Sequence, residues 1–397
     1  MRSVETMPIR RALRGVREQR GLDVAKVASF ASIAVDRLRQ FEAGEREPSR
    51  KQMQKLADIY GVPLYALFHD SIPNLPPLPT DFRKTDPRPA ELSPAGVKTL
   101  LWGERISQFT AQLAAELDYE APSLDASAHG SRSPQERAVR LRSAFDEWYI
   151  PKQADLGFSG AAEQRFMGAL RLFFEIQGGI VNVNEAPFED YLGYFLDPSA
   201  GLPTIFVNRS VSSKKAQLFT LVHEYCHALI GVEGISDPFR SKNNVERECN
   251  AFAAEFLAPM DQFSKVVEGF DKQVRSNISN FISCVSASSL LSKHAAAIRL
   301  VEGDYISAKD LRSWRRLFVA KPKAEKEEEK EAASGGGGQP HAKRISELGH
   351  LPVYLAKRAV DERLIDAYDV ADGIGLSTTL QDRAYSLVAR RFAAALP

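Results

Sequence analysis

The chain has 397 residues, 44% of them hydrophobic and 26% charged, with a formal net charge of +1. This length predicts two to four globular domains rather than a single core. No apolar stretch approaches the ~20 residues of a membrane span, no apolar run follows Met1, and three cysteines make no disulfide framework. We therefore expect a cytoplasmic protein without membrane partners.

The first 69 residues predict a small basic bundle of five short helices. They hold thirteen Lys and Arg against eight Asp and Glu, and such a surplus suggests an anionic partner, nucleic acid first. Asp23 can cap the second helix, and glycines at 21 and 44 end the first and third. The expected helices cover about 13–20, 24–30, 34–42, 51–60 and 63–68.

Residues 9–69 resemble the XRE-type helix-turn-helix domain of phage repressors. The resemblance rests on three segments, Phe41-Glu42-x-Gly44, Arg46-x-Pro48-Ser49 and Tyr60-Gly61-Val62. It implies double-stranded operator DNA as a partner, with the third helix in the major groove, and a homodimer on paired half-sites.

Within this resemblance, six polar side chains are expected to contact DNA. The third helix would present residues to the base edges, and the segment after it would meet phosphates. The expected contacts are Arg37, Arg39, Gln40, Arg46, Arg50 and Lys51. Val24 replaces the usual Gln of the second helix, and Asp36 adds a negative charge to the expected DNA-reading face. Both weaken direct readout, so a protein-contacting role for the bundle stays open.

The region between the bundle and residue 208 predicts a linker, helices and short strands. Residues 70–95 contain seven prolines and predict an extended, semi-rigid linker. Apolar residues at helical spacing over 96–155 predict a helical hairpin that bridges two functional parts. After a helix near 163–176, β-type runs at 179–183, 191–195 and 204–207 predict a small sheet, whose edge strand could pair with an extended substrate.

The segment His223-Glu224-Tyr225-Cys226-His227 is an H-E-x-x-H motif in apolar surroundings. On a helix, His223 and His227 lie one turn apart on one face and can supply two corners of a zinc tetrahedron. Glu224 can then act as a general base on water activated by the metal. The alternative is a helix with two unrelated histidines.

A third ligand is expected on the helix that the pattern of residues 245–257 predicts. Glu246 shares a helical face with Asn250 and Ala253, and a His₂Glu set would leave the fourth zinc position open, as in catalytic sites. Glu248 and Glu255 compete for this role, but Glu248 would point away from the Glu246 face. Each of these glutamates could instead be a solvated helix charge.

These motifs resemble the ImmA/IrrE family of gluzincin-like metallopeptidases. The resemblance covers roughly 165–310 and rests on Ile205 to Asn208, Phe219 to Ile230, Glu246 to Ala254 and Leu257-Ala258-Pro259. It implies Zn²⁺ held by His223, His227 and Glu246, with Glu224 as base and acid. It also implies a protein substrate, typically a helix-turn-helix repressor.

The chain departs from the family at two cysteines. Cys226 and Cys249 stand where Gly and Ala are usual, on helices expected to touch. They are interpreted as small buried thiols or as a possible redox pair.

Residues 274–306 resemble the helical module that follows the catalytic region of this family. Beyond it, a charged and Gly-rich segment precedes an amphipathic helical tail that suggests no function. The predicted fold is α+β and mostly helical: a five-helix helix-turn-helix bundle, a zincin-like metallopeptidase domain with a small β-sheet, and a helical C-terminal module. The predicted boundaries are 8–69 for the bundle, 70–95 for the linker, 96–155 for the connector, 156–320 for the metallopeptidase domain, 321–340 for the second linker and 341–397 for the tail.

The combined prediction is a DNA-binding, zinc-dependent endopeptidase that controls transcription in stress response or mobile-element regulation by cleaving a repressor-type protein or itself. One alternative is a catalytically silent regulator that uses the metallopeptidase-like domain as a sensor. Another is the antitoxin-like member of a toxin pair.

Overall fold

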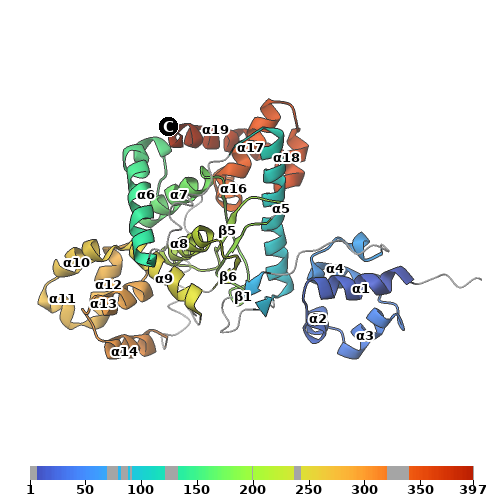
Figure 1. Cartoon of the computed structure of the whole chain (residues 1–397), viewed down its shortest axis with the longest axis horizontal. Helices are drawn as coiled ribbons and strands as arrows, with labels where there is room; N and C mark the ends of the chain where they lie inside the picture. Colours follow the sequence, from blue (N-terminus) through green and yellow to red (C-terminus); the bar gives the residue numbers. More distant parts are fainter. Residues whose placement is uncertain are drawn as a thin grey trace, which may run out of the picture.

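The computed structural model describes residues 7–68, 79–81, 88–89, 92–120, 133–198, 200–236, 243–319 and 339–396. An N-terminal helical bundle lies at one end, a mixed β-sheet with helices around it forms the central body, and a helical lobe lies at the other end (Figure 1). The mostly helical α+β architecture predicted from the sequence is confirmed. No helix in these ranges is long and apolar enough to cross a membrane.

Five short helices form the N-terminal bundle, as predicted, although the fifth is a 3₁₀ helix. They are α1 (Met7–Gln19), α2 (Val24–Ala31), α3 (Val35–Ala43), α4 (Arg50–Tyr60) and η1 (Leu64–Phe68). Asp23 caps α2 through the amide N–H groups of Ala25 and Lys26, and Ser49 forms a capping box with Gln52 at the start of α4. These local signals explain why the helix boundaries could be predicted.

The bundle packs on the central body through α5 (Pro94–Glu116). Leu13 and Tyr60 of the bundle belong to the same buried cluster as Val97 and Leu100 of α5. The bundle comes close to α5 at Gly61, where an added Cβ atom would lie 1.9 Å from the Leu101 side chain. The φ angle of Gly61 is +66°, which also favours glycine. The bundle and the body therefore share one continuous apolar core.

Six strands form one mixed sheet in the order β2-β1-β6-β4-β5-β3. The β3–β5 and β6–β1 pairs are parallel, and the other neighbours are antiparallel. The strands are β1 (Thr80–Asp81), β2 (Arg88–Pro89), β3 (Ile180–Asn184), β4 (Gly193–Leu196), β5 (Thr204–Asn208) and β6 (Gly234–Ser236). The three β-type runs predicted from the sequence correspond to β3, β4 and β5.

Two strands come from the predicted linker at 70–95, which is therefore not simply an extended spacer. Its residues 80–81 and 88–89 join the sheet as β1 and β2, whereas residues 70–78, with Pro76-Pro77, lie outside the described residues. Such short strands form only where a strand from another part of the chain, here β6, offers backbone groups to pair with. The residues of the linker alone do not show that this strand is nearby.

Two helices carry the motif residues and pack against each other. The first is α8 (Lys214–Ile230), which contacts β4 and β5, and the second is α9 (Asn244–Leu257). Ser213 caps α8, and Gly231 ends it in the left-handed region. Because nearly every side chain of α8 is buried, this helix lies inside the body rather than on its surface.

The predicted helical hairpin over 96–155 is wrong. Instead, α5 packs on α4, α17, β3 and β5, whereas α6 (Pro134–Leu156) packs on α7 (Ala162–Glu175), α9 and α19. Figure 1 shows the two helices on opposite sides of the central body. Helical spacing identified both helices, but the choice of packing partner is a tertiary property.

The C-terminal residues form two separate groups of helices. The first is the lobe of α10 (Met260–Glu268), α11 (Lys272–Ser276), α12 (Ile278–Ala287), α13 (Lys293–Glu302) and α14 (Ala308–Val319). Residues 320–338, most of the predicted second linker, lie outside the described residues. The second group is α16 (Pro340–Leu348), α17 (His350–Asp361), α18 (Ala367–Ile374) and α19 (Thr378–Ala395).

The second group is part of the central body rather than a peripheral tail. Its apolar residues Leu351, Leu355 and Phe392 share a buried cluster with Ile106 and Leu113 of α5. The helices α16–α19 therefore complete the core on the side of β3 and α5 (Figure 1).

Candidate metal and catalytic site

Three side chains from α8 and α9 converge in the core of the body. The Nε2 atoms of His223 and His227 lie 3.3 Å apart. Glu246, in the first turn of α9, places Oε1 3.2 Å from His227 Nε2 and Oε2 3.4 Å from His223 Nε2. All three side chains have an exposed fraction of 0%. The structure thus brings together the three residues that the sequence suggested as metal ligands.

The Nδ1 atoms of both histidines contact other groups, and these contacts turn each Nε2 atom toward the centre. His223 Nδ1 lies 2.9 Å from the side-chain oxygen of Asn250, and His227 Nδ1 lies 3.1 Å from the carbonyl oxygen of Val232. Both partners are acceptors, so each Nδ1 carries the proton and each Nε2 presents a lone pair. Two imidazole lone pairs and a carboxylate therefore face one another without a proton between them.

This donor set fits a tetrahedral cation. Ligands bound to zinc at about 2.0–2.1 Å lie roughly 3.3 Å from one another, which matches the observed separations. Glu246 Oε2 is buried without a hydrogen-bond partner. Burial raises the pKa of Glu246, but His223 and His227 with a proton on Nε2 outweigh it and lower this pKa to about 2; a cation between the neutral rings would act in the same direction. The carboxylate is therefore ionised and available to a metal.

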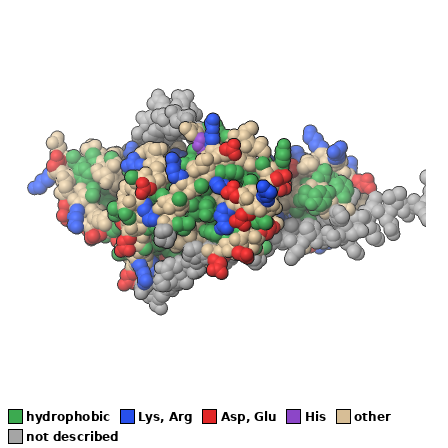
Figure 2. Space-filling view, turned by 90° about the horizontal axis from the view of Figure 1, so that it is seen from above, with side chains coloured by type: hydrophobic (Ala, Val, Ile, Leu, Met, Phe, Trp, Pro, Cys, Tyr) green, Lys and Arg blue, Asp and Glu red, His purple; other side chains and the backbone are tan. Residues whose placement is uncertain are grey.

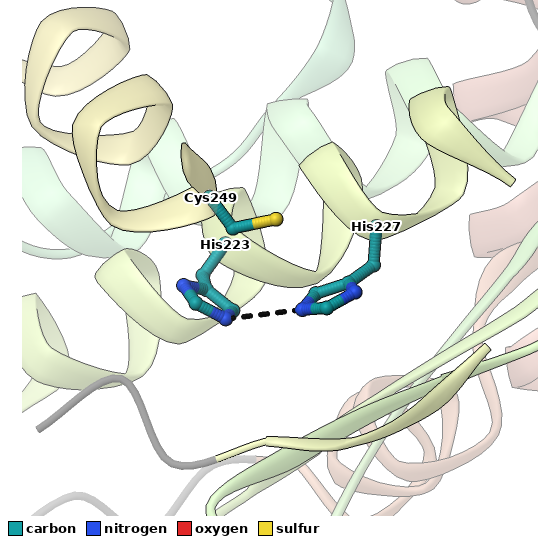
Figure 3. Close-up of side chains that lie close together, drawn as sticks. All are labelled: His223, His227 and Cys249. Atoms are coloured by element: carbon teal, nitrogen blue, oxygen red, sulfur yellow. Dashed lines mark hydrogen bonds between the residues drawn. The ribbon is translucent and has the colours of Figure 1, made fainter. Parts of the chain in front are cut away.

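Cys249 is a second candidate for the third ligand. Its Sγ atom and the ring nitrogens of His223 and His227 lie within 4.8 Å of one another (Figure 3). Burial, followed by contact with the Cys226 thiol, raises the pKa of Cys249 well above its ordinary value. Since the thiolate is the ligating form of cysteine, we favour the ionised Glu246.

The same facts bear on the possible redox pair. Cys226 and Cys249 are both buried with free thiols, and their side chains contact each other across α8 and α9. Burial and the raised pKa of Cys249 slow reaction with oxidants, since thiolates are the reactive species. A Cys226–Cys249 redox pair stays a hypothesis, and the packing role of small thiols is the simpler interpretation.

Glu224 lies beside this centre, and only one of its two carboxylate oxygens accepts a hydrogen bond. Its Oε1 accepts a hydrogen bond from the Ser236 hydroxyl of β6, and its Oε2 is buried without a hydrogen-bond partner. Burial raises the pKa of Glu224 to about 8, although His227 and Ser236 act in the opposite direction. A carboxylate with a pKa near neutrality and a free oxygen can take up and return a proton.

The backbone of β4 limits where Glu224 can lie. A Cβ atom added to Gly193 would lie 2.5 Å from Glu224 Oε1 and 2.6 Å from the Thr220 methyl carbon. Only glycine allows the strand to approach the carboxylate this closely.

The two competing glutamates of α9 are engaged elsewhere. Glu248 forms an ion pair with Arg137 of α6, and Glu255 forms one with Arg299 of α13. Neither carboxylate joins the histidine pair. Their side chains serve contacts between helices.

Sequence reasoning missed the partners that hold this site in place. Asn250 follows Glu246 by one helical turn, so the shared face was a signal for its contact with His223. Ser236 and Gly193 carried no local signal, because they reach Glu224 only through the packing of the sheet on α8.

The side chains expected to contact DNA lie on α3, in the loop after it and in the first turn of α4. Arg37, Arg39, Arg46, Arg50 and Lys51 are exposed, and Gln40 is half-buried. Arg39 lies 3.4 Å from Asp36, the acidic residue of the same helix. Figure 2 shows Lys and Arg side chains beside hydrophobic ones on the face of the bundle that it displays. The structure thus leaves the expected DNA-reading face open to a partner.

Two segments of the chain match models of known protein families. Residues 9–66 match the model of a helix-turn-helix domain, and residues 179–287 match the model of the IrrE N-terminal-like domain, a peptidase family that is generally zinc-associated. The chain joins these two domains. The IrrE N-terminal-like segment contains α8, α9 and every residue of the site described above. Neither the curated proteins nor the solved structures contain a match.

These matches confirm the predicted combination of domains. They support a DNA-binding regulator with a metallopeptidase-like domain. A helix-turn-helix domain and an IrrE N-terminal-like domain in one chain place nucleic-acid binding and the candidate metal centre in the same molecule.

Proposed function

We propose that this IrrE N-terminal-like protein is a zinc-dependent endopeptidase joined to a DNA-binding domain. The observation that carries the proposal is the convergence of two imidazole lone pairs and the Glu246 carboxylate, with a free Glu224 oxygen beside them. The substrate would be a repressor-type protein or the chain itself, so that cleavage changes transcription.

In this mechanism His223, His227 and Glu246 would hold the metal. Zinc, when bound, supplies a Lewis acid that activates water near neutral pH and polarises a peptide carbonyl. Asn250 and the Val232 carbonyl keep both imidazoles in the tautomer that presents Nε2. Glu224 accepts a proton at its free oxygen and returns it to the leaving amine, while Ser236 fixes the other oxygen.

Substitution of Glu224 tests this function. Glu224→Gln should retain zinc, because Glu224 is not among the proposed ligands, and should abolish cleavage. The measurement compares new protein amino termini in cells that carry the wild type or the variant, together with the zinc content of both purified proteins. Glu268→Gln, an exposed change on α10, is the matched control and should behave as wild type. Cleavage that persists in Glu224→Gln would refute the peptidase.

A sensor that cuts nothing is the second candidate. It is favoured by one observation: His223, His227, Glu224 and Glu246 all have an exposed fraction of 0%. A metal or ligand bound in so closed a site could shift the structure without any substrate reaching it. Identical regulation of a reporter gene by wild type and Glu224→Gln would support this candidate.

For the N-terminal domain we propose that α3 enters the major groove. Arg37 and Gln40 would hydrogen-bond base edges, and Arg39 would line the same face. Three exposed cations beyond α3 would contact phosphates; these are Arg46, Arg50 and Lys51. The exposure of this face and the helix-turn-helix match support the assignment.

A further inference from the structure

The strand β6 is the part of the sheet most directly connected to the candidate site. Its residue Ser236 donates a hydrogen bond to Glu224, and Val232, just before the strand, accepts one from His227. In Figure 3 a strand that continues into the grey trace passes beneath the two imidazoles. A chain segment paired with the outer side of β6 would therefore run next to the catalytic groups.

The linker strand β1 holds that position. β6 pairs with β4 on one side, and on the other side Asp81 of β1 pairs with Ile235. Without β1, the outer backbone groups of β6 would form an unpaired edge, which readily accepts an extended peptide. β1 therefore occupies the edge that a peptide would use.

The contact between β1 and β6 is small, but it is tethered at both ends. Its register consists of a single pair, Asp81 with Ile235. On one side the linker follows η1 of the docked bundle, and on the other side Ser93, at the start of α5, donates its amide N–H to Asp190 over 2.9 Å. Tethering gives a weakly bound segment a high effective concentration, so it can compete with a free peptide.

We infer that β1 is an internal competitor for extended peptides at the outer edge of β6. The inference rests on the proposed peptidase function and adds its regulation: a peptide segment gains the edge only when β1 leaves it. The full burial of the four site side chains agrees with a closed state in which β1 is seated. The partner is defined by backbone chemistry, as an extended segment with free N–H and C=O groups.

Peptide binding to full-length protein tests the inference without cleavage. All proteins carry Glu224→Gln, and the probe is a fluorescein-labelled peptide with the sequence of residues 77–86. Thr80→Pro with Asp81→Pro removes both N–H donors of β1, whereas Thr80→Ala with Asp81→Ala retains them and is the matched control. If β1 fills the edge for nine-tenths of the time, the proline variant binds the probe about tenfold more tightly in fluorescence anisotropy. Equal affinities would overturn the inference.

Hydrogen exchange on the Glu224→Gln protein with its natural linker gives a second test that needs no substitution in β1. Saturating peptide should accelerate exchange at the amides of Thr80 and Asp81 while those of 234–236 stay protected. Exchange at residues 80–81 that is unchanged by bound peptide would overturn the inference. Because binding is measured with Glu224→Gln protein, absence of cleavage in the wild type would refute the peptidase and leave this result intact.

Discussion

Asn250 illustrates how much of the site depends on residues that touch no metal. Its side-chain oxygen lies 2.9 Å from His223 Nδ1, which fixes the imidazole tautomer and orientation. Such partners of metal-binding histidines commonly change metal affinity by 10- to 100-fold when they are removed. The tautomer of His223 is therefore set by α9 rather than by α8.

Replacement of Asn250 tests this orienting role. Asn250→Ala should weaken zinc binding by about 10- to 100-fold, because His223 loses the acceptor that orients it. Asn250→Asp retains an acceptor oxygen and should remain close to wild type. Competition with a chromogenic zinc chelator measures both affinities. Equal weakening in the two variants would contradict the orienting role.

At the scale of elements, α17 is attached to the body by a buried polar network. Glu175 of α7 accepts hydrogen bonds from the amide N–H of His350 over 2.9 Å and from its Nδ1 over 2.7 Å. On the other side of the ring, Arg391 of α19 donates to His350 Nε2 over 3.0 Å. Arg171 of α7 reaches the carbonyl oxygens of Val181 and Ser346. The network joins α7, β3, α16, α17 and α19.

This network predicts a dependence of stability on pH. Burial, and after it Arg391 and Arg171, lower the pKa of His350, although Glu175 opposes the shift. Below the ordinary histidine pKa of about 6.5 the unfolded chain binds a proton that the folded protein resists, so the free energy of unfolding falls as pH falls. The loss should reach at most about 1.4 kcal/mol per pH unit from this group.

Thermal unfolding of the zinc-loaded protein between pH 7.5 and 5.5 tests this dependence. His350→Gln removes the titrating ring and should flatten the pH profile, whatever its effect on the absolute melting temperature. Parallel profiles for the wild type and the variant would show that His350 does not contribute.

A second prediction at this scale concerns the apolar packing of α17. Leu355 is 0% exposed and lies in the cluster that α17 shares with α5, whereas Leu364, after the same helix, is 46% exposed. Leu355→Ala should lower the free energy of unfolding by about 2–5 kcal/mol, because it leaves a cavity. Leu364→Ala should change it by no more than about 0.5 kcal/mol. Denaturant unfolding measures the free energy of unfolding of both variants. If Leu355→Ala lowers it as little as Leu364→Ala does, α17 is not part of the core.

At the scale of the whole molecule, α5 connects the two matched domains. It contributes to the core of the N-terminal bundle through Val97 and Leu100, and to the core beside α17 through Ile106 and Leu113. Arg20 of the bundle is buried close enough to Glu104 of α5 for the two charges to affect each other's pKa. The proposed DNA-binding face and the candidate metal centre therefore lie in one continuously packed structure.

DNA binding by the full chain gives the prediction at this scale. If Arg46, Arg50 and Lys51 contact phosphates, replacing all three by Ala should reduce the slope of log affinity against log salt by about 0.9 per lost contact. Titrations of a random 40-base-pair duplex pool at several salt concentrations measure this slope. Arg105→Ala, an exposed change on α5, should leave it unchanged. An unaltered slope in the triple variant would favour a protein partner for this domain.

Features that depend on local periodicity could be predicted from the amino-acid sequence. The helical period places His223 and His227 on one face and Glu246 with Asn250 on another, and caps such as Ser49 and Gly61 define where helices of the bundle start and end. These signals span a few residues, so they survive without knowledge of the rest of the chain. They were sufficient to favour Glu246 over Glu248, whereas the predicted fold class also rested on the resemblance to the two families.

Contacts between segments that are distant in the chain could not be predicted in this way. The pairing of β1 with β6, the contact of Ser236 with Glu224, the separation of α5 from α6 and the burial of α17 all depend on which surfaces exclude water together. Burial of apolar area is non-directional, and strand pairing uses backbone groups that every residue has. Neither property produces a recognisable local pattern in the sequence. The sequence therefore predicted a linker at 70–95, although part of this segment pairs with the strand that contacts Glu224.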